Sequence, residues 1–331
     1  MRSGSWRSAL NGDPLPWLLE TDTPAVRHRA LVQLAGEPED APVVRRARRA
    51  AMRSGPIASI LAAQDPQGFW VRPGSGYSPK YTGTVWSLIF LDQLGADPAD
   101  RRIARACGYV LGHAQAPNGG FGWQPTNSTV VHCLNGNLLR ALLGFGWFED
   151  PRVRSAIEWE ARSITGEGFD GYHPWATSGP GFGCGINGGL PCGWGAIKAL
   201  RGLVRVPARR RTAVVRRALR DGTAFLLSRD PADADYPTNT TVSRNWFKLG
   251  FPSGYVADVL QDLEVLTELG HARDPRLHRA IELVLAKQDA AGRWKNEHAY
   301  PRKTWGEIDR QGRPSKWVTL RACTVLRAAL G

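Results

Sequence analysis

One seven-residue pattern occurs three times in this chain, and it limits the fold more than any other feature of the sequence. The copies read Q-x3-G-x-aromatic and span Gln64–Trp70, Gln115–Phe121 and Gln288–Trp294, each directly after an amphipathic helical stretch. A degenerate fourth copy, Gly166–Phe169, lacks the glutamine. Glycine permits the tight turn that ends a helix, and the aromatic ring can cover the joint between neighbouring units. The chain is therefore expected to be a repeat array.

A second helical pattern follows each turn, so the repeating unit is predicted to be a helical hairpin. Arginine-rich outer helices are predicted over Pro42–Ala63, Ala99–Ala114, Pro151–Ser163, Ala213–Ser228 and Pro275–Lys287. Inner helices, richer in Leu, Ala, Gly and Trp, are predicted over Gly83–Leu94, Val130–Leu143, Gly193–Val204, Tyr255–Leu269 and Lys316–Ala329. The helical stretch Thr23–Leu34 is counted with a further hairpin.

An array of this length can curl into a closed ring, in which inner helices run parallel and outer helices return. We predict an all-α fold, an α/α toroid of about six helical hairpins with an inner and an outer helix ring. One toroid domain is expected over residues 1–331, with a flexible N-terminal segment over residues 1–14.

Composition places the chain among globular proteins. Its hydrophobic content of 42% is ample for a core, and it shows neither a long apolar run nor an apolar region at the N-terminus, so a cytoplasmic location is expected. The formal charge of +13 comes mostly from arginines at helical spacing. These read as a solvated face, with peripheral contact to an anionic membrane as the alternative; nucleic acid is not expected as a partner.

The Q-x3-G-x-aromatic element resembles the QW repeat of squalene-hopene and oxidosqualene cyclases. The hairpin plan is similar to that of the terpene cyclase, protein prenyltransferase and squalene oxidase repeat proteins. Two segments, 246–258 and 314–320, also resemble a bacterial subgroup with a single toroid. The resemblance covers residues 17–330 and implies an isoprenoid or other apolar ligand in a central cavity, although a repeat fold does not determine function.

Acidic residues near the start of the fifth inner helix are the first candidates for chemistry. Tyr255, Asp258 and Asp262 are spaced at i, i+3 and i+7, so they share one stripe of a helix. Two carboxylates held close together in an apolar cavity can share a proton, which would give one of them a general-acid role. The alternative is a pair of acids on the helix flank, with Asp258 favoured by the helix dipole.

The second inner helix opens with an unusual density of polar residues. His132 could act as the polar counterpart of the acids, with Asn135 and Asn137 on successive turns orienting a ligand or water. A hydrogen-bonded structural histidine is the alternative. The glycine-rich loop from Gly179 to Gly195 suggests a backbone that passes close to another group or moves as a lid.

Metal binding has weak support. Cys133, Cys184 and Cys192, together with His132, are candidate zinc ligands, but their spacing fits no standard zinc motif. The five cysteines are expected to be reduced thiols. The resemblance to prenyltransferases would imply zinc held through D-x-C, and the resemblance to class II cyclases would imply D-x-D-D as the acid. Neither motif occurs, and the chain has half the length of the triterpene cyclases.

Tryptophans supply the remaining candidates for substrate binding. Aromatic faces can line an apolar pocket and stabilise a cationic intermediate, and packing wedges between hairpins are the alternative. Those that begin or precede inner helices are Trp86, Trp194, Trp246, Trp305 and Trp317.

Three functions follow from these observations. The first is an isoprenoid cyclase or transferase. The second is a non-catalytic lipid-binding or scaffold toroid, favoured by the missing motifs. The third is a polysaccharide lyase or glycosidase on an α/α toroid.

Overall fold

The computed structural model describes residues 6–168 and 178–331, and these residues are mainly α-helical. A two-stranded antiparallel ribbon of β1 (Ser178–Gly179) and β2 (Gly183–Cys184) is the only sheet in this part of the chain. The helices are α1 (Leu15–Leu18), α2 (Pro24–Gln33), α3 (Pro42–Ala51), α4 (Gly55–Ala62), α5 (Thr84–Leu94), α6 (Arg101–His113), α7 (His132–Gly144), α8 (Pro151–Thr165), α9 (Gly193–Leu203), α10 (Ala213–Leu226), α11 (Val259–Glu268), α12 (His278–Leu285) and α13 (Lys316–Leu330).

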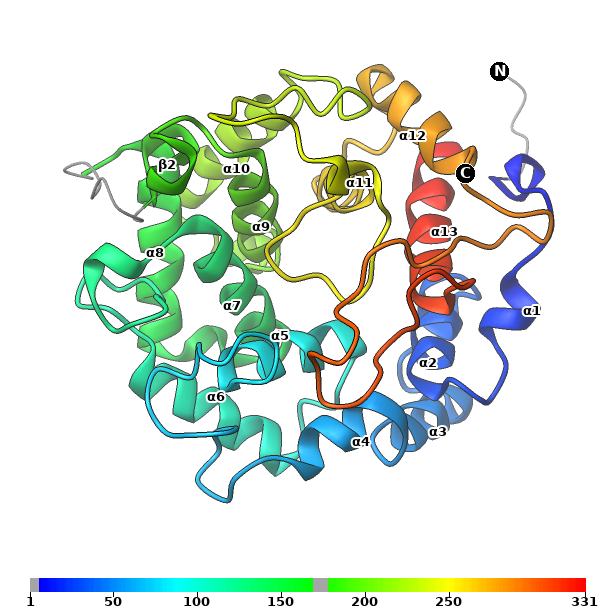
Figure 1. Ribbon diagram of the computed structural model, residues 1–331, viewed down its shortest axis with the longest axis horizontal. Coiled ribbons are helices and arrows are strands. Elements are labelled where there is room, and N and C mark those ends of the chain that lie inside the picture. Colours follow the sequence, from blue (N-terminus) through cyan, green and yellow to red (C-terminus); the bar gives the residue numbers. More distant parts are fainter. Residues whose placement is uncertain (1–5, 169–177) are drawn as a thin grey trace.

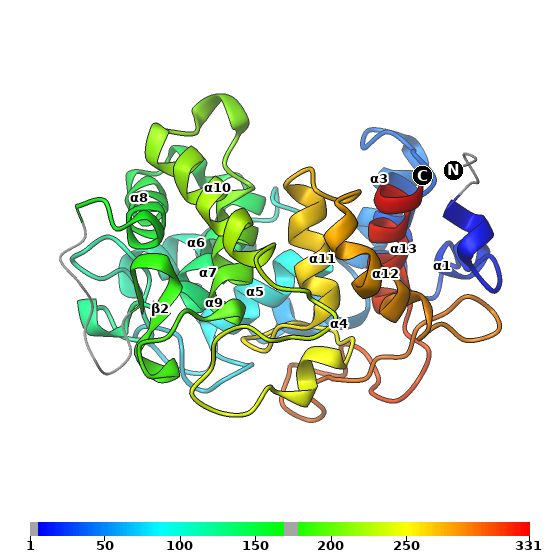
Figure 2. The same cartoon turned by 90° about the horizontal axis from the view of Figure 1, so that it is seen from above.

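The helices form two concentric rings, which confirms the predicted α/α toroid (Figure 1). The inner ring consists of α2, α5, α7, α9, α11 and α13, and α3, α4, α6, α8, α10 and α12 lie outside it. Helix α13 packs against α2, and Arg29 Nη2 of α2 donates to Asp92 O of α5 at 2.7 Å, so the inner ring closes. The view at 90° shows the loops that precede the inner helices gathered at one face of the ring (Figure 2).

Two helix boundaries differ from the sequence-based prediction. The outer helix predicted over Pro42–Ala63 is broken into α3 and α4, and Gly55 at the break has φ +59°. The inner helix predicted from Tyr255 begins at Val259, because Asp258 adopts extended backbone angles and caps the helix with its side chain. Residues 252–257 therefore form a loop instead of the first turn.

The glutamines of the three Q-x3-G-x-aromatic turns join neighbouring outer helices. Gln64 Nε2 donates to Arg102 O in the first turn of α6 at 3.0 Å, and Gln115 Nε2 donates to Arg152 O in the first turn of α8 at 2.8 Å. Gln288 Nε2 donates instead to Ala9 O at 3.2 Å, in the N-terminal segment. The third turn thus attaches the N-terminal segment to the end of α12.

The aromatic position joins each turn to the inner helix that follows it. The backbone N–H of Trp70 donates to Thr84 Oγ1 at 3.0 Å, that of Phe121 to Asn135 Oδ1 at 2.8 Å, and that of Trp294 to Thr319 Oγ1 at 2.9 Å. The indole N–H groups of both tryptophans donate to a carbonyl of the preceding helix at 2.7 Å. The repeated sequence element therefore performs one repeated structural task. In the degenerate fourth copy, Phe169 lies outside the described residues.

We predict that Gly68→Ala destabilises the protein far more than Gly74→Ala. Both glycines have φ in the left-handed region, at +100° and +120°. A Cβ at Gly68 would lie 2.7 Å from Arg105 O, whereas a Cβ at Gly74 meets nothing within 4 Å. Backbone strain is common to both variants. The difference between their free energies of unfolding, about 2 kcal/mol, therefore measures the clash with α6. Urea unfolding of the two variants checks it, and equal losses would contradict the interlocking of turn and helix.

The two ends of the described chain pack on the ring. Residues 1–5 of the segment that was expected to be flexible lie outside the described residues. Trp6–Ala9 form a 3₁₀ turn, and the Asn11 N–H donates to Gln288 Oε1 at 2.8 Å. Within residues 6–168 and 178–331, no helix has both the length and the apolar character needed to cross a membrane.

Candidate functional site

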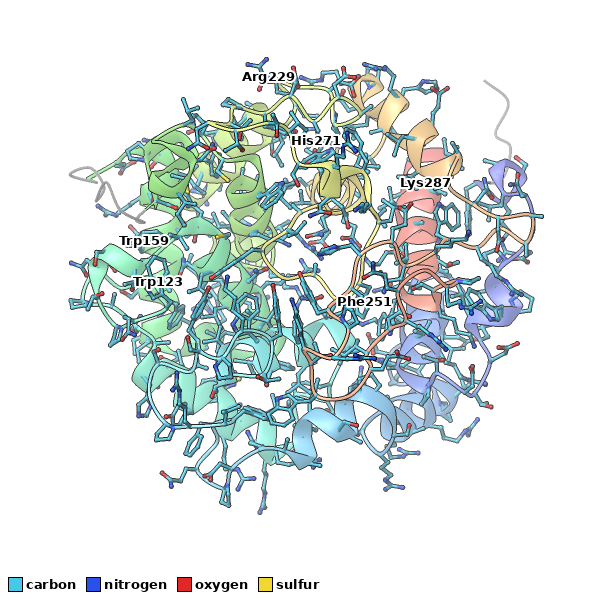
Figure 3. All side chains as sticks on the ribbon, viewed as in Figure 1. Trp123, Trp159, Arg229, Phe251, His271 and Lys287 are labelled. Carbon is cyan, nitrogen blue, oxygen red and sulfur yellow. The ribbon has the colours of Figure 1, made fainter. Side chains whose placement is uncertain are left out.

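The centre of the ring holds a small cavity with many charged side chains in its lining. Its volume is about 130 Å³, and the inner helices α2, α5, α7, α9, α11 and α13 all contribute to its wall. Phe251, from the loop before α11, also faces this region, and its ring stacks on Trp317 with centroids 4.5 Å apart (Figure 3). The charged residues of the lining are Arg29, Asp92, Arg140, Arg201, Arg205, Glu264, Glu268 and Arg321.

Ion pairs connect the inner helices around this cavity. Glu264 of α11 accepts two hydrogen bonds from Arg321 of α13, at 2.7 and 2.9 Å, and lies 3.4 Å from Arg201 of α9. Although burial opposes ionisation, the charges of Arg321 and Arg201 lower the pKa of Glu264 to about 2. Arg140 of α7 pairs with Glu268 at 3.1 Å. The acids of this group are thus held in the ionised form.

Five arginines face only three carboxylates in the cavity lining, so positive charge is in excess. Burial lowers the pKa of Arg29 and of Arg201 to about 10, and neighbouring arginines add to the effect. The Nε atoms of both residues are buried without a hydrogen-bond partner. Buried polar groups normally have hydrogen-bond partners, and a buried cation is normally paired with a negative charge. The arrangement is suited to an anion at the centre of the ring.

Asp258 is buried, at 3% exposure, and acts as the N-cap of α11. Its Oδ1 accepts from the Gln261 N–H at 2.8 Å, and its Oδ2 accepts from the Gly250 N–H at 3.1 Å. Arg321 Nη2 lies 3.8 Å away. These contacts give Asp258 a structural role, since its carboxylate joins the first turn of α11 to the preceding loop.

Asp262 is fully buried on a different side of α11 and has other partners. Its Oδ2 lies 3.1 Å from Tyr236 Oη, while its Oδ1 has no hydrogen-bond partner. Burial raises the pKa of Asp262 to about 7. The two aspartates therefore contact separate groups. Their carboxylates do not hydrogen-bond to each other, so the shared proton suggested by their spacing is not supported. Neither side chain lines the central cavity described above.

His132 belongs to a buried polar network between α7 and α8. Its Nδ1 lies 2.6 Å from Glu160 Oε1, and Asn135 Nδ2 donates to Glu160 Oε2 at 2.5 Å. Asn135 also receives the backbone N–H of Phe121, so it joins this network to a repeat turn. His132 is 1% exposed and faces the joint between an inner and an outer helix. This geometry resembles the structural alternative considered for His132, and Asn135 belongs to the same network.

An aromatic cluster closes the ring at the end where the inner helices begin. Trp86 is fully buried, and Tyr255 meets it edge-on with ring centroids 5.1 Å apart. The Asn137 amide donates to Gly254 O at 3.4 Å, which ties α7 to the loop that carries Tyr255. The remaining rings of the cluster are Tyr77, Tyr81, Phe90 and Tyr300.

The other candidate tryptophans lie in three separate places. Trp317 lines the central cavity, whereas Trp305 donates its indole N–H to Thr82 O at 2.9 Å in the loop before α5. Trp194 and Trp246 line a different pocket, between the loop before α9 and the loop before α11. The structure thus brings Trp86 and Tyr255 together, but it does not gather the tryptophans around one cavity.

The cysteines are free thiols in the described residues. Within residues 6–168 and 178–331, no group of three or more His, Cys, Asp or Glu side chains is arranged to hold a metal ion. The zinc set suggested by Cys133, Cys184, Cys192 and His132 is therefore not formed as a ligand cluster here. Cys184 and Cys192 do lie together, on the wall of the pocket that contains Trp194.

The arginines of the cavity are the functional candidates that sequence reasoning missed. Arg29, Arg140, Arg201 and Arg321 lie on inner helices, where the pattern otherwise favours apolar and small residues, and Arg205 follows the end of α9. An arginine within successive inner helices was the available signal. It was hidden among the many arginines of the outer helices.

Comparisons with known proteins give only distant similarity. No protein-family model and no curated protein matches the chain. Similar solved structures include type II terpene cyclase MstE from Scytonema without ligand, with TM-score 0.30 and 14% identity over 83% of this chain and 95% of that one. A variant of that cyclase with bound geranylgeranyl dihydroxybenzoate gives 0.30 and 13% over 83% and 94%. A protein from Actinoplanes gives 0.31 and 14% over 85% and 98%. At these scores the similarities support no inference about this chain, so its fold rests on its own helices.

Proposed function

We propose that the protein binds an isoprenoid, or another apolar molecule with an anionic group, and that the anionic group occupies the central arginine cavity. The excess of arginine over carboxylate in the cavity lining carries this proposal. The unpartnered Nε atoms of Arg29 and Arg201 supply two further donors for an anion. Trp317, Phe251 and Leu320 form the apolar part of the same wall and would contact the hydrocarbon.

The volume of the cavity favours an anionic head group over the whole ligand. A cavity of about 130 Å³ has room for a phosphate or diphosphate, since one water molecule takes about 30 Å³ of liquid. Guanidinium groups suit such groups because they bind phosphate oxygens in a bidentate manner. The hydrocarbon would therefore extend out of the cavity, along its apolar wall.

The charges of the cavity lining favour a reaction that begins with loss of an anionic leaving group from the substrate over one that begins with protonation of the substrate. Glu264 and Glu268 have lowered pKa values because of the arginines around them, so neither is a proton donor at neutral pH. Arginines, by contrast, stabilise the negative charge that develops on a departing diphosphate. A prenyltransferase-like or cyclase-like reaction that begins with loss of an anionic leaving group fits these residues.

We expect geranyl diphosphate to bind and geraniol, which lacks the anionic group, to bind at least about tenfold more weakly. Isothermal titration calorimetry measures both affinities, with inorganic diphosphate as a third ligand. Arg201→Gln should weaken geranyl diphosphate binding by about 10- to 100-fold, as expected for loss of a charged hydrogen-bond donor. Arg45→Gln, on the outer helix α3 and solvent-exposed, is the matched control and should leave affinity unchanged.

Equal binding of geraniol and geranyl diphosphate would contradict the proposal, as would equal losses in the two arginine variants. Circular dichroism of both variants first establishes that they are folded. Product analysis after incubation with geranyl diphosphate then separates a reaction from binding alone, which is the role of a lipid-binding toroid. An acidic oligosaccharide titrated in parallel tests the third function, and tighter binding of that ligand would also contradict the proposal.

A further inference from the structure

A second pocket, away from the central cavity, lies between the loop that precedes α9 and the loop over residues 234–246. Its volume is about 330 Å³, and its wall includes Cys184, Cys192, Trp194 and Trp246. Ile186, which is 69% exposed, belongs to its rim. Both cysteines are partly accessible, in contrast to the buried Cys107 and Cys323. Small solutes therefore have access to two thiols at one place on the surface.

The backbone places these two thiols side by side. Gly183 and Pro191 form an antiparallel bridge, the Cys184 N–H donates to Leu190 O at 3.1 Å, and the Cys192 N–H donates to Phe182 O at 2.9 Å. In an antiparallel pair, residues that flank a bridged pair on opposite strands project to the same face. The Cys184 and Cys192 side chains accordingly share one face of this pair, and both residues line the pocket.

The surroundings of this thiol pair favour a thiolate. The neighbouring Cys192 thiol lowers the pKa of Cys184 to about 6 against the effect of burial, and the backbone N–H groups of Asn187 and Ile186 and the charge of His132 lower it further. Cys192 is the N-cap of α9, and its Sγ accepts from the Gly195 N–H at 3.4 Å. Nearby donors are the environment in which a cysteine such as Cys184 becomes reactive. The neighbouring Cys184 and burial raise the pKa of Cys192 well above its ordinary value, so Cys192 keeps its proton.

We propose that Cys184 and Cys192 form a redox-active dithiol that a hydroperoxide oxidises to a disulfide. The Cys184 thiolate attacks one peroxide oxygen, the O–O bond breaks, and the departing oxygen takes up a proton, leaving Cys184 as a sulfenic acid. The Cys192 sulfur then attacks the Cys184 sulfur, and the S–S bond forms as the sulfenic oxygen leaves as water with the Cys192 proton. Two thiols and one hydrogen peroxide thus give one disulfide and two waters.

The oxidation has a defined structural consequence. The disulfide would tie the end of β2 to the N-cap residue of α9, and it would remove both thiols from the wall of the pocket. Access to the pocket would therefore depend on the redox state of the pair. The inference does not rest on the proposed function, since the thiol pair lies outside the central cavity.

The test is treatment of the reduced, full-length protein with hydrogen peroxide, followed by unfolding, alkylation of the remaining thiols and mass spectrometry. We expect loss of two hydrogen atoms from the intact mass, a peptide pair that joins Cys184 to Cys192, and alkylation of Cys107, Cys133 and Cys323 only. In the untreated protein at pH 7, iodoacetamide should modify Cys184 at least about tenfold faster than Cys107.

Serine variants keep the assignment falsifiable, because the serine oxygen can cap α9 in place of the Cys192 sulfur. Cys192→Ser should prevent the disulfide, leave a sulfenic acid on Cys184 that dimedone traps, and move the pH midpoint of Cys184 alkylation upward. Cys133→Ser is the control and should change none of these readouts. Five alkylatable thiols after peroxide treatment, a disulfide between two copies of the chain, or an unchanged alkylation profile in Cys192→Ser would each overturn the proposal.

Discussion

Replacing Asp262 by asparagine is expected to stabilise the protein by about 4 kcal/mol at pH 8. Asp262 is fully buried, and burial raises its pKa to about 7 from 3.8. A carboxyl group whose folded pKa is raised binds protons more tightly in the folded state. Its contribution to stability is therefore neutral below pH 4 and becomes unfavourable as the pH rises, reaching its full cost above pH 7. Asparagine keeps the shape and has no charge to bury.

The hydrogen bonds of Asp262 are compatible with this substitution. The Tyr236 hydroxyl donates to Leu226 O at 2.7 Å, so its oxygen is available to accept from a protonated carboxyl or from an amide at position 262. Urea unfolding from pH 4 to pH 8 checks the prediction. The advantage of Asp262→Asn over the wild type should grow steadily across this range, from under ~1 kcal/mol at pH 4.

Asp258→Asn provides a control of opposite sign on the same helix. Asp258 accepts two backbone N–H groups and lies near Arg321, so loss of its charge should cost about 1–2 kcal/mol. If Asp262→Asn were instead destabilising at pH 8, the folded protein would stabilise the ionised carboxylate of Asp262, and the pKa of Asp262 would be lowered instead of raised. The general-acid role considered for this residue would then also lose its physical basis.

The toroid could be predicted from the sequence because its determinants are local. Each Q-x3-G-x-aromatic turn is followed by the helix it contacts, so spacing alone predicts the hairpins. The start of α11 could not be predicted in this way, because the sequence spacing allows Asp258 to lie either in the first turn of the helix or at its N-cap. Its capping geometry depends on Gly250, in the preceding loop.

The candidate site was harder to predict, since it depends on contacts across the ring. Arg321 and Glu264 are separated by 57 residues, and no periodicity connects them. The helical spacing of Asp258 and Asp262 suggested a common pocket, but the neighbours of α11 differ on its two sides. Similarly, His132 was placed on an inner helix correctly, yet only the structure shows Glu160 of α8 beside it.

The second large effect is expected from Glu264, where glutamine should destabilise the protein by about 3 kcal/mol at pH 7. Glu264 is the main anionic partner of Arg321 and also lies near Arg201, and both arginines are buried. The substitution leaves these cations without a charge partner, and a buried unpaired charge is costly. Because the arginines lower the pKa of Glu264 to about 2, its contribution is present above pH 4.5 and is lost as the pH falls through 2.

Urea unfolding at pH 7 and pH 3 tests the effect of Glu264→Gln, and the difference from the wild type should be smaller at pH 3. Glu268→Gln is the matched control, because its side chain is 37% exposed and its pair with Arg140 is reached by solvent. Exposed pairs contribute under about 1 kcal/mol, so this variant should be nearly neutral. If Glu264→Gln also lost less than about 1 kcal/mol of unfolding free energy, the buried arginines would not depend on this carboxylate, and solvent would have to reach the cavity freely.

Addition of inorganic diphosphate should increase the stability of Glu264→Gln more than that of the wild type, because an anion in the cavity replaces the charge that was removed.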